Sequence, residues 1–106
     1  MIYVFDIDGT ICSNTNGNYE EAEPYMDRIS KINDLYGDGH KIIFFTARGM
    51  GRSNNDVDFA YENFYDITYN QLIKWKVKFH DLFLGKPEGN IYIDDKGVRS
   101  EEYFNE

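Results

Sequence analysis

The sequence predicts an α/β protein with a mostly parallel sheet. Apolar runs of strand length alternate with longer segments in which apolar residues recur every three or four positions. This alternation is typical of parallel sheets, in which helices connect neighbouring strands. A chain of 106 residues buries roughly two-thirds of its unfolded surface, enough for one sheet with helices on both faces. We therefore expect a single domain over residues 1–106.

The first predicted strand is followed at once by two carboxylates. Residues 2–5 are β-branched or aromatic, as in a buried strand. Because side chains alternate between the two faces of a strand, Asp6 and Asp8 should point to the same side near its carboxyl end. Gly9 would then let the chain turn sharply away. Two like charges in a partly desolvated place need a compensating cation or proton, which suggests a metal ion.

A polar loop and a helix are predicted between the first and second strands. The loop over residues 10–23 contains few apolar side chains. Pro24 suits the first turn of a helix, and apolar residues at helical spacing follow it. Gly37 and Gly39 then mark the helix end. Residues 41–46 form the second buried strand.

A longer helix and two short strands are predicted after a glycine-rich loop over residues 48–52. One apolar stripe at helical spacing runs from Val57 to Trp75. Three residues before it can cap the helix: Ser53, Asn54 and Asn55. Two further apolar runs, over residues 81–84 and 90–94, have strand length.

Charge and composition exclude several classes of partner. The chain has 19 acidic and 11 basic residues, a net charge of −8, and such a field repels nucleic acid. A single cysteine, Cys12, cannot form an internal disulfide and fits a reducing cytosol. No apolar run approaches the ~18 residues that span a bilayer, and Met1 opens directly into a strand without a signal peptide. We therefore expect a cytoplasmic protein without nucleic-acid or membrane partners.

Polar side chains end or follow each of the other predicted strands. Thr46 closes the second strand, Lys86 follows the third, and Asp94 with Asp95 closes the fourth. The carboxyl ends of parallel strands meet at one edge of a sheet, where ligands bind. Each group alone is a weak indicator, but their joint occurrence in this order is improbable by accident. We expect them to converge with the two carboxylates that follow the first strand.

With these motifs the chain resembles the haloacid dehalogenase superfamily, a group of Mg²⁺-dependent phosphatases and their relatives. DIDGT, FFTAR, GKP and IDDK match its four motifs over nearly the whole chain. More narrowly, TARGMG, the aromatic helix FAYENFYDITYNQL and GNIYIDDKGV resemble small bacterial phosphatases of capsular or surface-polysaccharide biosynthesis. The resemblance implies a three-layer α/β/α, Rossmann-like fold. The gaps between the motifs leave no room for the cap domain of many relatives, so we expect a capless, minimal enzyme.

The resemblance also implies roles for the residues at the strand ends. Asp6 would attack phosphorus and become an aspartyl phosphate. Asp8 would protonate the leaving oxygen and then activate water as a base. Thr46 and the backbone N–H of Ala47 would hold a phosphoryl oxygen. Lys86 would neutralise the developing charge and hold the nucleophile in place.

A magnesium site follows from the same resemblance. Asp6, the carbonyl of Asp8 and the carboxylate of Asp94 would bind Mg²⁺, which prefers such oxygens. Asp95 would act through water or by orienting its neighbours.

Two arginines near Thr46 admit two interpretations. Arg48 and Arg52 flank the glycine-rich loop just beyond this residue. On an acidic protein they could bind the remote part of a substrate, the role assigned to Arg48, or they could offset the nearby carboxylates. The sequence does not separate these interpretations.

We expect a Mg²⁺-dependent phosphomonoesterase acting on a small phosphorylated molecule, in particular a sugar or metabolite of polysaccharide synthesis. A polynucleotide 3′-phosphatase is an alternative that the negative charge opposes. A receiver-like phosphoacceptor module is another, but its acceptor Asp lies on the third strand, unlike Asp6 here. A non-catalytic structural subunit is a third. The aromatic content of 17% is high, consistent with a homo-oligomer in which some rings face a partner subunit.

Overall fold

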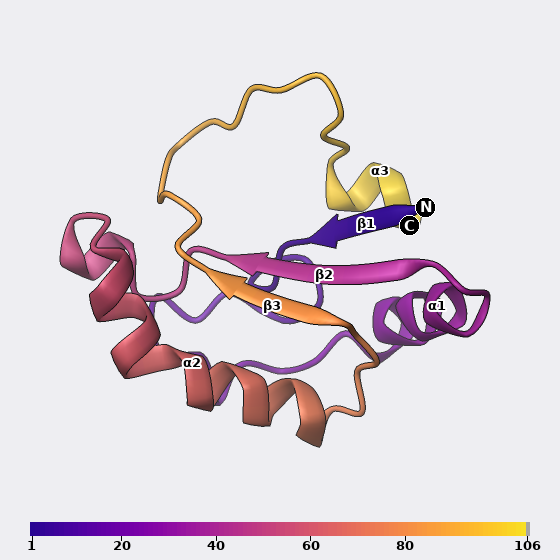
Figure 1. Ribbon diagram of the computed structural model, residues 1–106, viewed down its shortest axis with the longest axis horizontal. Helices are drawn as coiled ribbons and strands as arrows, with labels where there is room; N and C mark the ends of the chain where they lie inside the picture. The colour runs from indigo at the N-terminus through magenta and orange to yellow at the C-terminus, as the bar shows by residue number, and fades with distance from the viewer. Residues whose placement is uncertain (106) are drawn as a thin grey trace.

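The computed structural model describes residues 1–105, which form an α/β structure around a small parallel sheet (Figure 1). The strands are β1 (Ile2–Phe5), β2 (Lys41–Thr46) and β3 (Asp81–Leu84), paired in the order β1-β2-β3. In this register Phe5 lies beside Phe44, and Phe44 beside Leu82. The strands predicted over these three ranges, and their parallel pairing, are confirmed.

Two longer helices connect the strands, and a short one ends the described chain. They are α1 (Met26–Gly37), α2 (Val57–Lys74) and α3 (Ser100–Phe104), and two short 3₁₀ turns lie in the loops, η1 (Tyr19–Glu21) and η2 (Gly51–Ser53). The cap of α2 differs from the prediction, because Asp56 accepts the N–H of Phe59 at 3.1 Å. Asn54 and Asn55 have φ of 56° and 64°, so they turn the chain and do not cap the helix.

One face of the sheet carries the core. Phe5, Phe44 and Leu82 lie on this face and are buried against helical residues such as Ile29 of α1 and Leu72 of α2. Phe104 of α3 joins the same cluster and stacks on Phe5. All three helices therefore contribute to the apolar layer on this face.

The opposite face of the sheet stays open. Its side chains Ile2, Val4 and Phe83 are 66%, 60% and 47% exposed. A parallel sheet in three layers would bury such residues under a second set of helices. The parallel α/β architecture is thus confirmed, whereas a three-layer arrangement is not observed among residues 1–105.

The fourth predicted strand, over residues 90–94, does not form. Ile91 and Ile93 are 78% and 91% exposed, and this stretch leaves the sheet as a long loop between β3 and α3 (Figure 1). Side chains satisfy local backbone groups instead: the Asp94 carboxylate accepts the N–H of Lys96 and of Gly97. Such local bonds compete with the ladder bonds of a strand.

None of the helices in the described range is both long and apolar enough to cross a membrane.

Candidate active site

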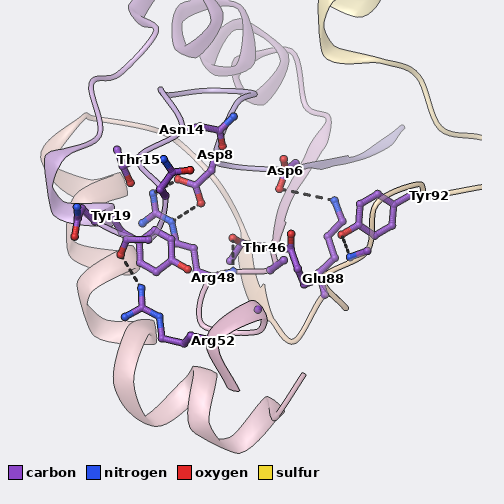
Figure 2. Close-up of a pocket in the computed structure, with 17 residues that line it drawn as sticks. Asp6, Asp8, Asn14, Thr15, Tyr19, Thr46, Arg48, Arg52, Glu88 and Tyr92 are labelled. Carbon is purple, nitrogen blue, oxygen red and sulfur yellow. Dashed lines mark hydrogen bonds and ion pairs between the residues drawn. The ribbon is translucent and has the colours of Figure 1, made fainter. Parts of the chain in front are cut away.

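The carboxyl ends of the strands bring Asp6 and Thr46 to one edge of the sheet (Figure 2), and Lys86 lines the same cavity. Asp6 directly follows β1, Thr46 is the last residue of β2, and Lys86 lies two residues beyond β3. The Lys86 ammonium is 3.8 Å from Asp6 Oδ1, and the Lys86 backbone N–H donates to the Thr46 carbonyl at 3.2 Å. The predicted convergence is therefore seen for these three groups.

A tight turn after β1 orients the first carboxylate. The N–H of Thr10 donates to the Ile7 carbonyl at 3.0 Å, and the Thr10 hydroxyl lies 3.4 Å from Asp6 Oδ2. Gly9 has a φ of +81°, and a Cβ at this position would lie 2.8 Å from Asn14 Nδ2. A larger residue would therefore be strained at position 9 and would displace the Asn14 side chain.

The environment of Asp6 favours its neutral form more than water does. Burial raises the pKa of the Asp6 carboxyl, and the Lys86 ammonium is the strongest opposing influence. A backbone hydrogen bond and the Thr10 hydroxyl also lower the pKa, while the charge of Asp8 raises it. A carboxylate that is desolvated in this way is a better nucleophile than a fully hydrated one.

Asp8 is held by Arg48. The guanidinium Nε and Nη2 donate to the two carboxylate oxygens, each at 2.9 Å, in a bidentate pair. The Arg48 side chain is fully buried, and that of Asp8 is 20% exposed. Of the two interpretations of this arginine, compensation of a carboxylate describes its observed contacts. These contacts differ from the expected binding of substrate by Arg48.

Thr46 is placed to bind an oxygen at the edge of the cavity. The residue is 1% exposed, and its hydroxyl oxygen accepts the backbone N–H of Arg48 at 3.2 Å. A hydroxyl that accepts in this way keeps its own hydrogen to donate. Ala47 lines the cavity beside it.

The cavity has a volume of about 810 Å³, and 17 residues line it. The loop from Asn14 to Tyr19 forms one wall, and Glu88 and Tyr92 lie on another (Figure 2). The Lys86 ammonium is 4.4 Å from the centre of the Tyr92 ring. Amide, hydroxyl and charged groups dominate this lining, so the cavity suits a polar ligand.

Thr15 supplies a polar group in the cavity wall that lacks a protein partner. Among the buried side-chain oxygen and nitrogen atoms of residues 1–105, the Thr15 hydroxyl oxygen is the one that has no hydrogen-bond partner. Buried hydroxyls in proteins nearly always have a partner. This oxygen has less than 1 Å² of accessible surface, so a ligand group reaches it only when the loop that carries Thr15 moves.

Asp94 and Asp95 do not reach the cavity, so the expected metal ligands Asp6, Asp8 and Asp94 are not brought together in this structure. Both are exposed, and neither lines the cavity. The physical reason is that the fourth strand does not form, so Asp94 does not end a strand of the sheet. Its carboxylate instead accepts the backbone N–H groups of Lys96 and Gly97 in a local turn. These two hydrogen bonds lower the pKa of the Asp94 carboxyl.

The described residues do not fit a Mg²⁺ ion as they are placed. Both oxygens of Asp8 are paired with Arg48, and Asp6 faces Lys86. Within residues 1–105 no three His, Cys, Asp or Glu side chains gather to hold a metal. In this arrangement the positive charge beside the two carboxylates comes from Arg48 and Lys86.

Cys12 is unsuited to nucleophilic chemistry. It is completely buried, and burial raises the pKa of its thiol to about 12. The thiolate, which is the reactive form, is therefore scarce at neutral pH.

Several residues of the site were not predicted from the sequence. Asn14, Thr15, Tyr19, Glu88 and Tyr92 line the cavity, and the polar loop after the first strand was the available signal for the first three. Glu88 and Tyr92 follow Lys86 closely in the sequence, but their position depends on the path of the loop after β3.

Comparison with known proteins provides one structural relative. Neither the protein-family models nor the curated proteins contain a match to this chain. The chain is similar to the crystal structure of an MCSG target from Vibrio cholerae, with a TM-score of 0.90 and 27% sequence identity. The match covers 99% of this chain and 88% of the other. The likeness supports the small α/β fold.

Proposed function

We propose that this protein is a phosphomonoesterase of the haloacid dehalogenase type, with Asp6 as the nucleophile. The observation that carries the proposal is the grouping of Asp6, Thr46 and Lys86 around one open, polar cavity. A carboxylate, a hydroxyl and an ammonium at this separation can attack phosphorus, hold a phosphoryl oxygen and stabilise the negative charge that develops.

The proposed reaction has two steps. An Asp6 oxygen bonds to phosphorus while the ester P–O bond breaks, and the leaving oxygen takes a proton from Asp8 or from water. Water then attacks the aspartyl phosphate, Asp8 accepts the proton of that water, and inorganic phosphate leaves. The bidentate contacts with Arg48 fix the orientation of the Asp8 side chain, which accepts the proton in the second step.

A chromogenic aryl phosphate tests the reaction class. We expect the purified protein to release phosphate from para-nitrophenyl phosphate and to form a phosphoprotein that hydroxylamine cleaves, as acyl phosphates are. No turnover with any divalent metal at any pH between 5 and 9 contradicts the proposal. A stable phosphoprotein without turnover would instead indicate a phosphoacceptor module.

Sugar phosphates are the proposed substrates, because the loop from Asn14 to Tyr19 in the cavity wall carries amides and the unpaired Thr15 hydroxyl. We expect hexose phosphates to have kcat/KM at least tenfold above those of mononucleotides and of 3′-phosphorylated oligonucleotides. Thr15→Val removes one hydroxyl at nearly constant volume and should raise KM for the best sugar phosphate about three- to tenfold.

An aryl phosphate, which lacks sugar hydroxyls, is the matched substrate for this variant and should show a smaller change in KM. Equal KM changes for both substrates, or preference for the oligonucleotide, contradict a sugar subsite at Thr15.

The expected Mg²⁺ requirement demands a different placement of Asp94 from the one described above. We expect titration calorimetry to detect Mg²⁺ binding that Asp94→Asn weakens at least tenfold and Asp95→Asn weakens less. Carboxylate ligands dominate Mg²⁺ affinity, which explains the size of the effect. Unchanged binding in Asp94→Asn would show that this carboxylate is not a ligand.

A further inference from the structure

Every N–H group of Arg48 is directed at another part of the protein. A guanidinium has five N–H donors, and Asp8 takes two of them at 2.9 Å each. Nη1 lies 2.8 Å from Gln71 Oε1 and 3.3 Å from Thr68 Oγ1, and Nη2 lies 3.9 Å from the Cys12 sulfur. The side chain is therefore saturated before any substrate arrives.

This saturation excludes Arg48 as a direct ligand of the phosphoryl group in this conformation. A buried cation is costly unless it is paired and hydrogen-bonded, and Asp8 supplies the negative charge. The bidentate geometry also fixes the plane of the Asp8 carboxylate, because two parallel N–H···O bonds allow little rotation.

The same guanidinium is tied to the loop that lines the far wall of the cavity. The Gln71 amide accepts from Arg48 and donates to the Tyr19 carbonyl at 2.8 Å. The Tyr19 ring lies 4.8 Å from the centre of the guanidinium, and its hydroxyl accepts the N–H of Gly49 at 2.9 Å. Tyr19 lines the cavity (Figure 2), so a continuous set of contacts joins the loop to Asp8.

We propose that Arg48 is a positioning residue that aims Asp8 at the reacting centre and, through Gln71, couples that aim to the loop ending at Tyr19. The inference rests on the proposed phosphatase function. A substrate whose remote part binds this loop and fixes its position would also fix the orientation of Asp8. Binding energy from contacts far from phosphorus would therefore raise kcat.

Arg48→Lys is the direct test, since lysine keeps the positive charge and loses the two-pronged contact. With para-nitrophenyl phosphate we expect kcat to fall about 10- to 100-fold, less than the about 10²- to 10⁴-fold that a general base contributes in full, with KM within about threefold of wild type. Because para-nitrophenolate leaves without a proton, hydrolysis of the aspartyl phosphate is the step that needs Asp8 with this substrate, and the steady-state fraction of phosphoprotein should rise.

The phosphoprotein fraction separates positioning from a structural role. A variant that is merely partly unfolded loses active molecules, but its remaining molecules partition between the two steps as wild type does. Rapid acid quench with ³²P-labelled substrate measures this fraction, and 50 mM guanidinium chloride should restore part of the rate of Arg48→Ala while sodium chloride does not.

Two further variants keep the inference falsifiable if Arg48 variants fold poorly. Gln71→Met removes the link to Tyr19 and leaves the pair with Asp8, and we expect a three- to tenfold lower kcat. Arg52→Lys is the matched comparison, because Arg52 lines the same cavity but donates to the Gly17 carbonyl. Arg52→Lys should change KM and leave the phosphoprotein fraction unchanged.

The outcomes are distinguishable from failure of the proposed function. Absence of turnover in the wild-type protein contradicts the phosphatase proposal and this inference together. Wild-type turnover combined with a raised KM and unchanged kcat in Arg48→Lys contradicts this inference alone, because that is the signature of a substrate-binding residue. An unchanged phosphoprotein fraction in both Arg48→Lys and Gln71→Met contradicts it as well.

Discussion

Replacement of Asp6 by asparagine is expected to lower turnover of an aryl phosphate by about 10⁴-fold or more, since removal of an enzyme's nucleophile has effects of this order. The amide keeps the size of the side chain, but it is a far weaker nucleophile and cannot form an acyl phosphate. The variant should also yield no hydroxylamine-sensitive phosphoprotein. Initial rates and acid-quenched samples of equal protein concentration measure both effects.

This loss should not arise from unfolding. Burial raises the pKa of Asp6 in the folded protein above its ordinary value of 3.8, so between these two values the folded state binds more protons than the unfolded state. The stability contribution of this group therefore falls as pH rises through that interval and remains reduced at pH 7. Asparagine has no charge to desolvate, and the thermal midpoint of Asp6→Asn at pH 7 should equal or exceed that of wild type.

Asp66→Asn is the control for both measurements, because Asp66 is an exposed residue of α2 outside the cavity lining. It should retain wild-type turnover and thermal midpoint. More than a tenth of wild-type turnover in Asp6→Asn, in a preparation free of wild-type protein, would contradict the assignment of the nucleophile.

Replacement of Lys86 by methionine should reduce kcat about 10²- to 10³-fold, as removal of a group that stabilises developing charge does. It should also change the pH dependence. The Lys86 ammonium lowers the pKa of Asp6, whereas burial and Asp8 raise it. Without the ammonium, Asp6 becomes ionised only at a higher pH, so the acid limb of the kcat/KM profile should move upward. Profiles between pH 4 and 8 measure the shift.

The chain offers a matched control for this lysine. Lys41 also pairs with an aspartate, 3.3 Å from Asp81, but at the opposite, amino ends of β2 and β3. Both side chains of that pair are exposed, and such pairs contribute little to stability. Lys41→Met should leave rate and profile unchanged. An acid limb of Lys86→Met that stays in place or moves to lower pH would show that the ammonium does not act on Asp6.

The predicted strands and the convergence of Asp6, Thr46 and Lys86 depended on local patterns. Short apolar runs mark where each strand ends. The parallel arrangement of β-α-β segments then places all those ends at one edge. This reasoning needs no knowledge of individual contacts, which is why it succeeded for residues far apart in the sequence.

The same reasoning failed for the segment that includes Asp94. The apolar run Ile91, Tyr92 and Ile93 predicts a strand, but a strand exists only when another strand pairs with it. In the structure, Tyr92 instead donates its hydroxyl hydrogen to the Pro87 carbonyl and accepts the Gly89 N–H. These local bonds keep the segment apart from the sheet, and no pattern within the segment could have indicated this.

By itself the sequence determined the three paired strands, the helical segments between them and the edge at which a carboxylate, a hydroxyl and an ammonium meet, because hydrophobic periodicity and element order are local properties of the chain. Only the tertiary structure decided that Arg48 takes both oxygens of Asp8, that Gln71 joins this pair to Tyr19, and that the second face of the sheet stays open. The physical reason is that these ion pairs and hydrogen bonds join residues 23 to 52 positions apart, and layer packing also depends on elements distant in the sequence. Their partners are selected by the geometry of the whole fold and not by spacing along the chain.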